Sequence, residues 1–420
     1  MTDLVDLNPK PNRSEMFDNL EVSFVPMASV EAGSGQVDVA NIRKYAEVKK
    51  GYTYFREGDI LFAKITPCME NGKIAVVHGL KNGIGFGSTE FHVLRPKPGI
   101  NPHYVYHFIS SSSFRASAAH EMTGAVGQKR VPAGFLESAL IPEATGDEQL
   151  EIVAELEKQF SRLDEAVANL KRVKANLKRY KAAVLSSALR GQLWATHPTQ
   201  ANSARPEFAP EIDLPSGWSW ASTAEVCDVV ASGSTPKADE MVSGSGEVPF
   251  LKVYNLGFDG SLDFTVKPTF VRRAIHEGPL NRSRCFPGDV LMNIVGPPLG
   301  KISFVPGDFP EWNINQAIVT FRAGPRVLNR LLAFWLMSPE VGERIERTSK
   351  ATAGQFNVQV STCRKLVLPM PPVEEQRNIV DEIDRRLSIV QGVEAEVDVN
   401  LRRAHTLRQT ILARAFASGC

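Results

Sequence analysis

The sequence predicts a mixed α/β (α+β) fold in which two globular domains with mixed β-sheets are joined by two long helices that pair as an antiparallel coiled coil. Three observations support this prediction. Two long stretches have the apolar periodicity of helices and lack proline, they match each other at a constant offset, and a segment of short β-prone runs precedes each of them. The repeat predicts an internal duplication with a pseudo-twofold axis.

The first stretch, residues 147–193, contains no proline and no glycine before Gly191. Its apolar residues recur at steps of three and four, which places them along one stripe of a helix. A stripe of this length needs a partner helix to cover it, as in a coiled coil. The stripe consists of Ile152, Leu156, Phe160, Leu163, Ala166, Leu170, Val173, Leu177, Tyr180 and Val184.

The predicted partner is a second stretch of the same chain, residues 373–420. At an offset of 227 residues, Glu148-Gln149 matches Glu375-Gln376, Ile152-Val153 matches Ile379-Val380, Phe160 matches Leu387, and Ala188 matches Ala415. Acidic residues gather early in each stretch and basic residues late. Antiparallel pairing would therefore set opposite charges side by side, and the charges also suit each helix dipole. Two surface helices of unrelated domains are the alternative.

The duplication extends into the segments that precede the helices. Gly58-Asp59-Ile60-Leu61 corresponds to Gly288-Asp289-Val290-Leu291, Gly72-Lys73 to Gly300-Lys301, and Gly127-Gln128 to Gly354-Gln355. We therefore expect a domain at 1–146, a helix at 147–193, a linker at 194–213, a domain at 214–372 and a helix at 373–420. The first domain lacks an opening equivalent to Gly217-Trp218, which leaves its start open.

Short apolar runs bounded by turn residues predict the strands. They lie at 22–25, 58–64, 74–77, 90–94 and 139–142 in the first domain, and at 250–254, 288–293 and 366–368 in the second. Helices are expected at 102–119 and 328–337. Glycine-rich loops are expected at 122–131 and 351–357.

Composition narrows the class of protein. The chain has 420 residues, 43% hydrophobic residues and a formal charge of +1, so two ordinary cores fit and any DNA-binding surface must be confined to part of the molecule. Five scattered cysteines without a Cys-x-x-Cys pair predict a reducing compartment, with neither a disulfide framework nor a zinc site. No signal peptide or membrane span is expected, which predicts a soluble cytoplasmic protein.

No catalytic motif is predicted. Gly296-Pro297-Pro298-Leu299 lacks the polar first residue and the aromatic last residue of an amino-methyltransferase loop. Residues 296–301 fail the P-loop spacing, and Asp59, Glu70 and Lys73 have the wrong spacing for a nuclease. The eight histidines show no metal-ligand spacing such as His-Glu-x-x-His, so no metal site is predicted.

A set of local signatures resembles the specificity subunit of type I restriction–modification enzymes. These signatures are Leu214-Pro-x-Gly-Trp218, Gly233-Ser-Thr-Pro236, Gly288-Asp-Val-Leu291, the Gly-Gln loops, and the Glu-Gln pair that leads into each helix. The resemblance covers nearly the whole chain and rests on the order of the motifs.

The resemblance implies a non-catalytic subunit of a cytoplasmic host-defence complex. Each globular part would be a target recognition domain for one half of a bipartite site in double-stranded DNA. The paired helices would act as a spacer and dock two methyltransferase (modification) subunits, which restriction (motor and nuclease) subunits then join. S-adenosylmethionine, ATP and Mg²⁺ would be held by those partners, with no cofactor on this chain.

Loop residues with cationic, amide or hydroxyl side chains are the candidate DNA contacts, because cations meet phosphates and amides meet base edges. In the first domain they are Lys64, Thr66, Lys73, Gln128, Lys129 and Arg130; in the second they are Ser234, Thr235, Lys237, Asn293, Lys301, Lys350, Gln355 and Asn357. For any one of them, a solvated turn residue is the alternative. For the chain, the alternatives are a scaffold joining two protein-binding heads, or an enzyme with its own active site.

Overall fold

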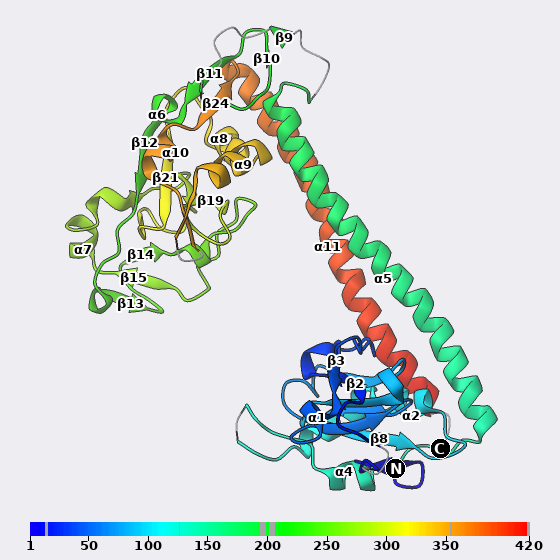
Figure 1. Cartoon of the computed structure of the whole chain (residues 1–420). Helices are drawn as coiled ribbons and strands as arrows, with labels where there is room; N and C mark the ends of the chain where they lie inside the picture. Colours follow the sequence, from blue (N-terminus) through cyan, green and yellow to red (C-terminus); the bar gives the residue numbers. More distant parts are fainter. Residues whose placement is uncertain are drawn as a thin grey trace. The chain divides into compact units, whose positions relative to one another are not determined.

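The computed structural model describes residues 1–12, 16–125, 127–193, 199–200, 206–207, 209–352 and 355–417. The chain divides into two compact units, Met1–Lys171 with Asp398–Cys420, and Arg172–Val397. Each unit combines one globular part with portions of two long helices, α5 (Gly146–Leu189) and α11 (Val373–Ala417) (Figure 1). The mixed α/β class and the two long helices are confirmed.

The globular part of the first unit contains two four-stranded sheets, ordered β1-β8-β5-β6 and β3-β2-β7-β4. The first sheet is antiparallel, and the second contains one parallel pair, β2 with β7. The central strand β5 is the apolar run ILFA, which is buried along its whole length. The strands are β1 (Val5–Leu7), β2 (Glu21–Val25), β3 (Ile42–Lys44), β4 (Thr53–Arg56), β5 (Ile60–Ala63), β6 (Ile74–Val76), β7 (Ile84–Gly87) and β8 (Phe91–Pro96).

The helices of this part are α1 (Tyr45–Val48), α2 (Pro102–Ile109), α3 (Ser112–His120) and α4 (Ala133–Ser138), with 3-10 turns η2 (Met27–Ser29) and η3 (Lys81–Gly83). The single helix predicted at 102–119 is wrong, because it breaks at Ser110 and Ser111. The hydroxyl of Ser111 accepts a hydrogen bond from the Phe114 N–H (3.3 Å) and so caps α3. Serine favours such caps over helix interiors, which explains the break.

The strand predicted at 139–142 is also wrong: these residues form no strand, and Leu140 is 88% exposed. In the second unit the corresponding segment is β24 (Val367–Met370), and it pairs antiparallel with β11 (Ser219–Ser222) just after Gly217-Trp218. The described part of the first unit has no strand equivalent to β11, so the backbone at 139–142 has no ladder to join. Its carbonyls accept single hydrogen bonds instead, Ala139 from the amino group of Met1 (2.6 Å) and Pro142 from the Tyr104 hydroxyl (2.8 Å).

The second unit repeats the arrangement of the first. Its antiparallel sheet β12-β21-β17-β19 matches β1-β8-β5-β6, and its sheet β13-β15-β14-β20-β16 again contains one parallel pair, β14 with β20. The strands of these sheets are β12 (Cys227–Ser232), β13 (Met241–Ser243), β14 (Val248–Leu251), β15 (Thr269–Val271), β16 (Arg284–Cys285), β17 (Val290–Asn293), β19 (Ile302–Phe304), β20 (Trp312–Ile314) and β21 (Ile318–Ala323). The predicted duplication is therefore present in strand order and direction.

Further elements complete the second unit. They are the strands β9 (Thr199–Gln200), β10 (Leu214–Pro215), β18 (Val295–Gly296), β22 (Lys350–Thr352) and β23 (Gln355–Asn357), the helices α6 (Thr223–Val226), α7 (Arg273–Glu277), α8 (Asn329–Leu336), α9 (Pro339–Thr348) and α10 (Val360–Arg364), and the 3-10 turns η4 (Ala238–Glu240), η5 (Val253–Asn255) and η6 (Asn281–Ser283). The glycine-rich segment predicted as a loop at 351–357 contains strands β22 and β23, while Gly354 lies outside the described residues. The strand predicted at 250–254 ends at Leu251, and the one predicted at 366–368 continues through Pro369 to Met370.

The two long helices run antiparallel within each unit. In the first unit, Leu156 and Phe160 of α5 are buried against Leu412 of α11, and Arg408 bonds Asp164 (2.7 Å). In the second unit, the later part of α5 meets the beginning of α11, where Lys181 bonds Glu394 (2.5 Å). The apolar contacts there join Val184, Leu185 and Ala188 to Ile379, Val380 and Ile383. Opposite charges therefore face each other, as predicted from the charge pattern.

Burial along the predicted stripe is uneven. Leu156, Phe160 and Val184, towards the two ends of the helix, are buried. Val173 and Tyr180, between them, are 40% and 47% exposed. Periodicity alone therefore overestimated the covered part of the stripe.

The Glu-Gln pairs mark joints between each long helix and its globular part. Gln149 accepts a hydrogen bond from the Asn101 N–H (2.9 Å) just before α2 and donates to the Ala144 carbonyl (2.9 Å). Gln376 accepts from the Leu328 N–H (2.9 Å) just before α8 and donates to the Arg326 carbonyl (2.9 Å). Both glutamines are buried, so the matching residues perform the same structural task twice.

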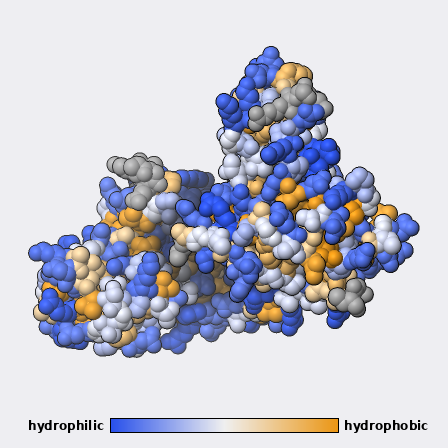
Figure 2. Space-filling view, turned by 90° about the horizontal axis from the view of Figure 1, so that it is seen from below, coloured by the Kyte–Doolittle hydropathy of each residue, from blue (hydrophilic) through white to orange (hydrophobic). Residues whose placement is uncertain are grey.

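No helix in the described part of the chain is long and apolar enough to cross a membrane. On the face shown in Figure 2, hydrophilic side chains predominate and hydrophobic ones are gathered in groups between them.

Candidate nucleic-acid interface

In the first unit, two loops that were predicted to contact DNA lie against each other. Arg130 forms β-bridges with Ile65 and Thr123, and the Thr66 N–H donates to the Lys129 carbonyl (3.0 Å). The hairpin at 123–130 is thus docked on the loop that leaves the central strand β5. The structure brings Lys64, Thr66, Gln128, Lys129 and Arg130 together in this way.

These five residues have different roles within the cluster. Arg130 forms a two-pronged ion pair with Glu90 (2.9 and 2.8 Å), and its hydrogen bonds hold the pKa of Glu90 below the ordinary value. Thr66 accepts a hydrogen bond from the Lys129 N–H (3.1 Å). Gln128 and Lys129 are exposed, and within the described chain their side chains make no hydrogen bond or ion pair. Arg130 and Thr66 therefore hold the loop while Gln128 and Lys129 face solvent.

The second unit builds the same feature from different residues. Strand β23 pairs with β18 so that Asn357 lies opposite Val295, and the Val358 N–H donates to the Ile294 carbonyl (2.9 Å). Asn357 is therefore equivalent to Arg130, again at an offset of 227 residues, and it is exposed. Lys350 lies opposite it in β22, and Gln355 precedes it in β23. A hairpin docked on the loop after the central strand thus occurs once in each unit.

Asn293 lies beneath this loop and not on its surface. It is 0% exposed. Its amide donates to the carbonyls of Val295 (3.2 Å) and Pro298 (2.8 Å) and accepts from the Lys301 N–H (2.8 Å). The side chain therefore shapes the loop from within.

The repeated Gly-Lys motif places a lysine in the same internal contact twice. Lys73 donates its ammonium to the Met27 carbonyl (2.9 Å) in η2, and Lys301 donates to the Val253 carbonyl (3.0 Å) in η5. Each lysine therefore links the hairpin after the central strand to a 3-10 turn through a backbone carbonyl.

The loop at 233–237 forms a separate polar group in the second unit. Arg282 donates to the Ser234 hydroxyl (3.2 and 3.0 Å), the Thr235 hydroxyl donates to Gln316, and Lys237 is exposed. A Cβ on Gly233 would collide with the carbonyl oxygen of Ile314, so the glycine is required by close approach. The sequence analysis missed Arg282 and Gln316 because both lie far along the chain from this loop.

The repeated Gly-Asp motif also has a structural explanation. Asp59 bonds Arg95 through two contacts (2.8 and 2.7 Å), and Asp289 bonds Arg322 in the same way (3.0 and 2.8 Å). Each pair ties the start of the central strand to its neighbouring strand. These aspartates are therefore part of the framework that positions the loops.

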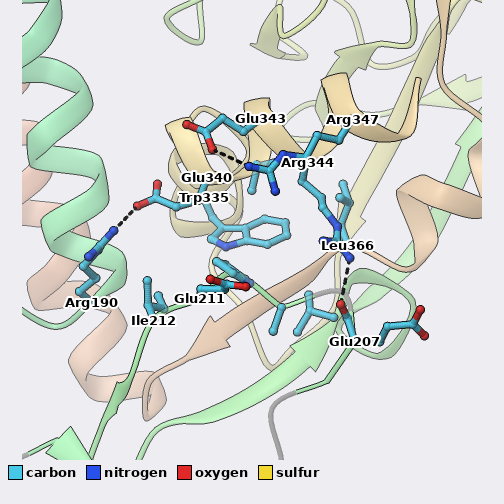
Figure 3. A pocket seen from close by; sticks show the side chains of 14 residues that line it. Arg190, Glu207, Glu211, Ile212, Trp335, Glu340, Glu343, Arg344, Arg347 and Leu366 are labelled. Atoms are coloured by element: carbon cyan, nitrogen blue, oxygen red, sulfur yellow. Dashed lines mark hydrogen bonds and ion pairs between the residues drawn. The ribbon is translucent and has the colours of Figure 1, made fainter. Parts of the chain in front are cut away.

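A pocket of about 310 Å³ in the second unit is lined by arginine and glutamate side chains (Figure 3). Arg190 pairs with Glu340 (3.2 Å), and Arg344 donates to the Glu207 carbonyl (2.9 Å). Its lining contains arginine, glutamate and apolar residues, with no serine, cysteine or histidine among them. The pocket lining therefore offers no Ser–His or Cys–His pair of nucleophile and base.

Comparisons with known proteins point to one family, although no family model matches the chain. It is 43% identical over 166 residues to the "Type I restriction enzyme EcoAI specificity subunit" of Escherichia coli, which covers 39% of this chain and 28% of that protein. It is 26% identical over 324 residues to the EcoBI specificity subunit of Escherichia coli, covering 75% of this chain and 65% of that protein. The chain thus spans well under two thirds of the first of these relatives.

Solved structures share the fold. One, described as the structural basis of complex assembly and conformational transition of the type I R-M system, has a TM-score of 0.72 at 20% identity and covers 95% of this chain and 92% of its own. The HsdS subunit from Thermoanaerobacter tengcongensis has a TM-score of 0.54 at 19% identity, covering 99% and 95%. The resemblance to type I restriction enzyme specificity subunits is therefore confirmed in sequence and in fold.

Proposed function

We propose that this chain, a homologue of type I restriction enzyme specificity subunits, is the subunit that reads a bipartite DNA sequence for its complex. The observation that carries the proposal is the duplicated site. Each unit docks a hairpin on the loop after its central strand and exposes amide or cationic side chains there, Gln128 and Lys129 in one and Asn357 in the other. One reading surface per unit suits a site with two half-sequences.

The chemistry of the loops supports DNA as the ligand. A glutamine or asparagine amide can bond an adenine edge with two hydrogen bonds, and a lysine can bond phosphate oxygens. The two hairpins carry different side chains at equivalent places, Arg130 and Asn357. We therefore propose that the two units read different half-sequences, which makes the whole site asymmetric.

The remaining candidates are proposed as supports or as separate contacts. Thr66, Arg130, Asn293, Lys73 and Lys301 have internal partners, and we propose that they position the loops. Ser234 and Thr235 also have internal partners, Arg282 and Gln316, and are proposed as supports of the loop at 233–237. Lys64, Lys237, Lys350 and Gln355 are proposed as contacts to the DNA backbone or bases.

The paired helices are proposed as the spacer and as the docking surface for two methyltransferase subunits, with restriction subunits joining the assembled complex. S-adenosylmethionine, ATP and Mg²⁺ are assigned to those partners, so this chain is non-catalytic and acts in the cytoplasm, where the DNA lies. Residues 1–146 and 214–372 are proposed as the two target recognition domains.

The test is a methylation assay with the purified chain and its cognate methyltransferase subunit. We expect neither component alone to methylate a specific site, and the mixture to methylate adenines in one bipartite sequence. Methylation or cleavage by the purified chain alone would contradict the proposal. A complex with the methyltransferase that shows no preference among DNA sequences would favour the scaffold alternative.

A further inference from the structure

Three side chains of the first unit come together at a place that the DNA-reading proposal does not use. His103 and His107 lie four residues apart in α2, about one helical turn, and so share a face. Glu157 comes from α5, with its Oε1 3.7 Å from Nδ1 of His103. One potential ligand atom from each of the three residues lies within 4.8 Å of the other two.

His107 is the buried member of this group. The residue is 5% exposed. The centre of its ring lies 5.0 Å from the ring centre of Tyr106 and 5.6 Å from that of Phe160. Within the described part of the chain, the buried Nε2 of His107 has no hydrogen-bond partner. Buried polar atoms in folded proteins are nearly always paired, so this nitrogen indicates a missing ligand.

The charge nearest to hand does not oppose a bound cation. Arg408 lines the same cavity as the two histidines, and its positive charge is paired with Asp164 (2.7 Å). His78 stacks parallel to His103 with ring centres 5.7 Å apart, and its Nδ1 lies 3.4 Å from Glu57. His103, His107 and Glu157 all line one cavity of about 650 Å³.

We propose that His103, His107 and Glu157 bind a divalent transition-metal ion of the Zn²⁺ type, and that this ion joins α2 to the long helix α5. Two imidazole nitrogens and one carboxylate suit such ions, whereas Mg²⁺ and Ca²⁺ prefer oxygen ligands throughout. Water in the cavity would complete a tetrahedral site. Because ligands about 2.1 Å from one ion lie roughly 3.4 Å apart, the side chains must move slightly closer together on binding.

The sequence held a partial signal for this site. His103 and His107 have the i, i+4 spacing of the two histidines in His-Glu-x-x-His, so the prediction that the histidines show no metal-ligand spacing overlooked this pair. The motif's glutamate is absent between them, and the third ligand lies far along the chain in the long helix.

The test uses the full-length chain without a histidine tag, treated with a chelator and then titrated with Zn²⁺ alone. We expect one zinc per chain. At a free zinc concentration about 100 times the dissociation constant, we expect a stabilisation that raises the melting temperature of the first unit by roughly 5–11 °C. Mg²⁺ at the same concentration should produce no shift. Zinc content is measured by elemental analysis, and melting is followed by circular dichroism.

Variants locate the ion. H103A and H107A should lose the bound zinc and the thermal shift, and E157Q, at a residue that is exposed, should weaken binding without unfolding the chain. The matched control H120A removes an exposed histidine of α3 in the same unit and should bind as the wild type does. Absence of zinc from the wild type, wild-type binding by E157Q, or loss of binding in H120A would each overturn the proposal. DNA recognition is measured separately, so the two proposals can fail independently.

Discussion

Gln376 allows a quantitative test of how a globular part is joined to its long helix. The side chain is 0% exposed and makes three hydrogen bonds, to the Leu328 N–H (2.9 Å) and to the carbonyls of Arg326 (2.9 Å) and Pro371 (3.1 Å). Gln376→Leu keeps a side chain of similar size and removes all three. Since each lost bond costs about 1 kcal/mol and buried groups remain unpaired, we expect the free energy of unfolding to fall by about 3 kcal/mol.

The chain provides its own probe for this measurement. All five tryptophans lie between residues 172 and 397, so tryptophan fluorescence reports the unfolding of the second unit. A loss of about 3 kcal/mol should lower the melting temperature of a unit of this size by roughly 6–12 °C. The matched control is Arg377→Ala at the exposed neighbouring position, where a change within about 0.5 kcal/mol is expected. A Gln376→Leu melting temperature within about 2 °C of the wild type would refute the reasoning.

Gln376→Glu adds a pH signature to the same test. The new carboxylate would face two carbonyl oxygens, so burial and repulsion should raise its pKa in the folded state above the unfolded value of about 4.3. Stability is then fully present below the unfolded pKa and is lost as the pH rises through the folded pKa. The difference between this variant and the wild type should therefore shrink as the pH falls towards 4, and a constant difference would contradict the assignment of the carbonyl contacts.

Three further predictions concern the interface, the helices and acid stability. Replacing Gln128, Lys129 and Arg130 together by alanine should alter recognition of one half-sequence only. Replacing Lys350, Gln355 and Asn357 together should alter recognition of the other half-sequence. If either triple variant keeps the wild-type methylation pattern and DNA affinity, its loop is not part of the interface. Insertion of about four residues, one turn or roughly 6 Å, late in α5 should lengthen the preferred spacer by one or two base pairs, measured on duplexes that differ only in spacer length; a folded, methyltransferase-binding variant that keeps the original spacer would show that the helix does not set it. His92 is buried, and burial lowers its pKa, so its contribution to stability should be lost as the pH falls below about 6.5. His92→Gln should flatten the acid unfolding curve followed by circular dichroism, and an equally steep curve would contradict this assignment.

The two docked hairpins that are proposed to read DNA show how much can be predicted from local sequence patterns. The hairpins at 122–131 and 351–357 were expected to carry polar contacts because glycine and cationic residues cluster there. Their docking on the loops after β5 and β17 could not be predicted, since it depends on bridges between residues such as Ile65 and Arg130. The ion pair of Arg130 with Glu90 changes the proposed role of that arginine from a contact to a support.

The sequence by itself determined the two long helices, their antiparallel pairing and the duplication. Apolar periodicity and charge order depend on residues close in sequence, and the repeated motifs are found by comparing the sequence with itself. Only the tertiary structure decided which segments had partners. Residues 139–142 have the sequence pattern of a strand but form none, because the described part of the first unit has no equivalent of β11. Residues 102–119 divide at the Ser111 cap. The internal hydrogen bonds of Asn293 and Lys301, and the proximity of His107 to Glu157, could not be predicted for one physical reason. The free energy of a polar side chain depends on groups brought to it by folding from distant parts of the chain, and no local pattern records those groups.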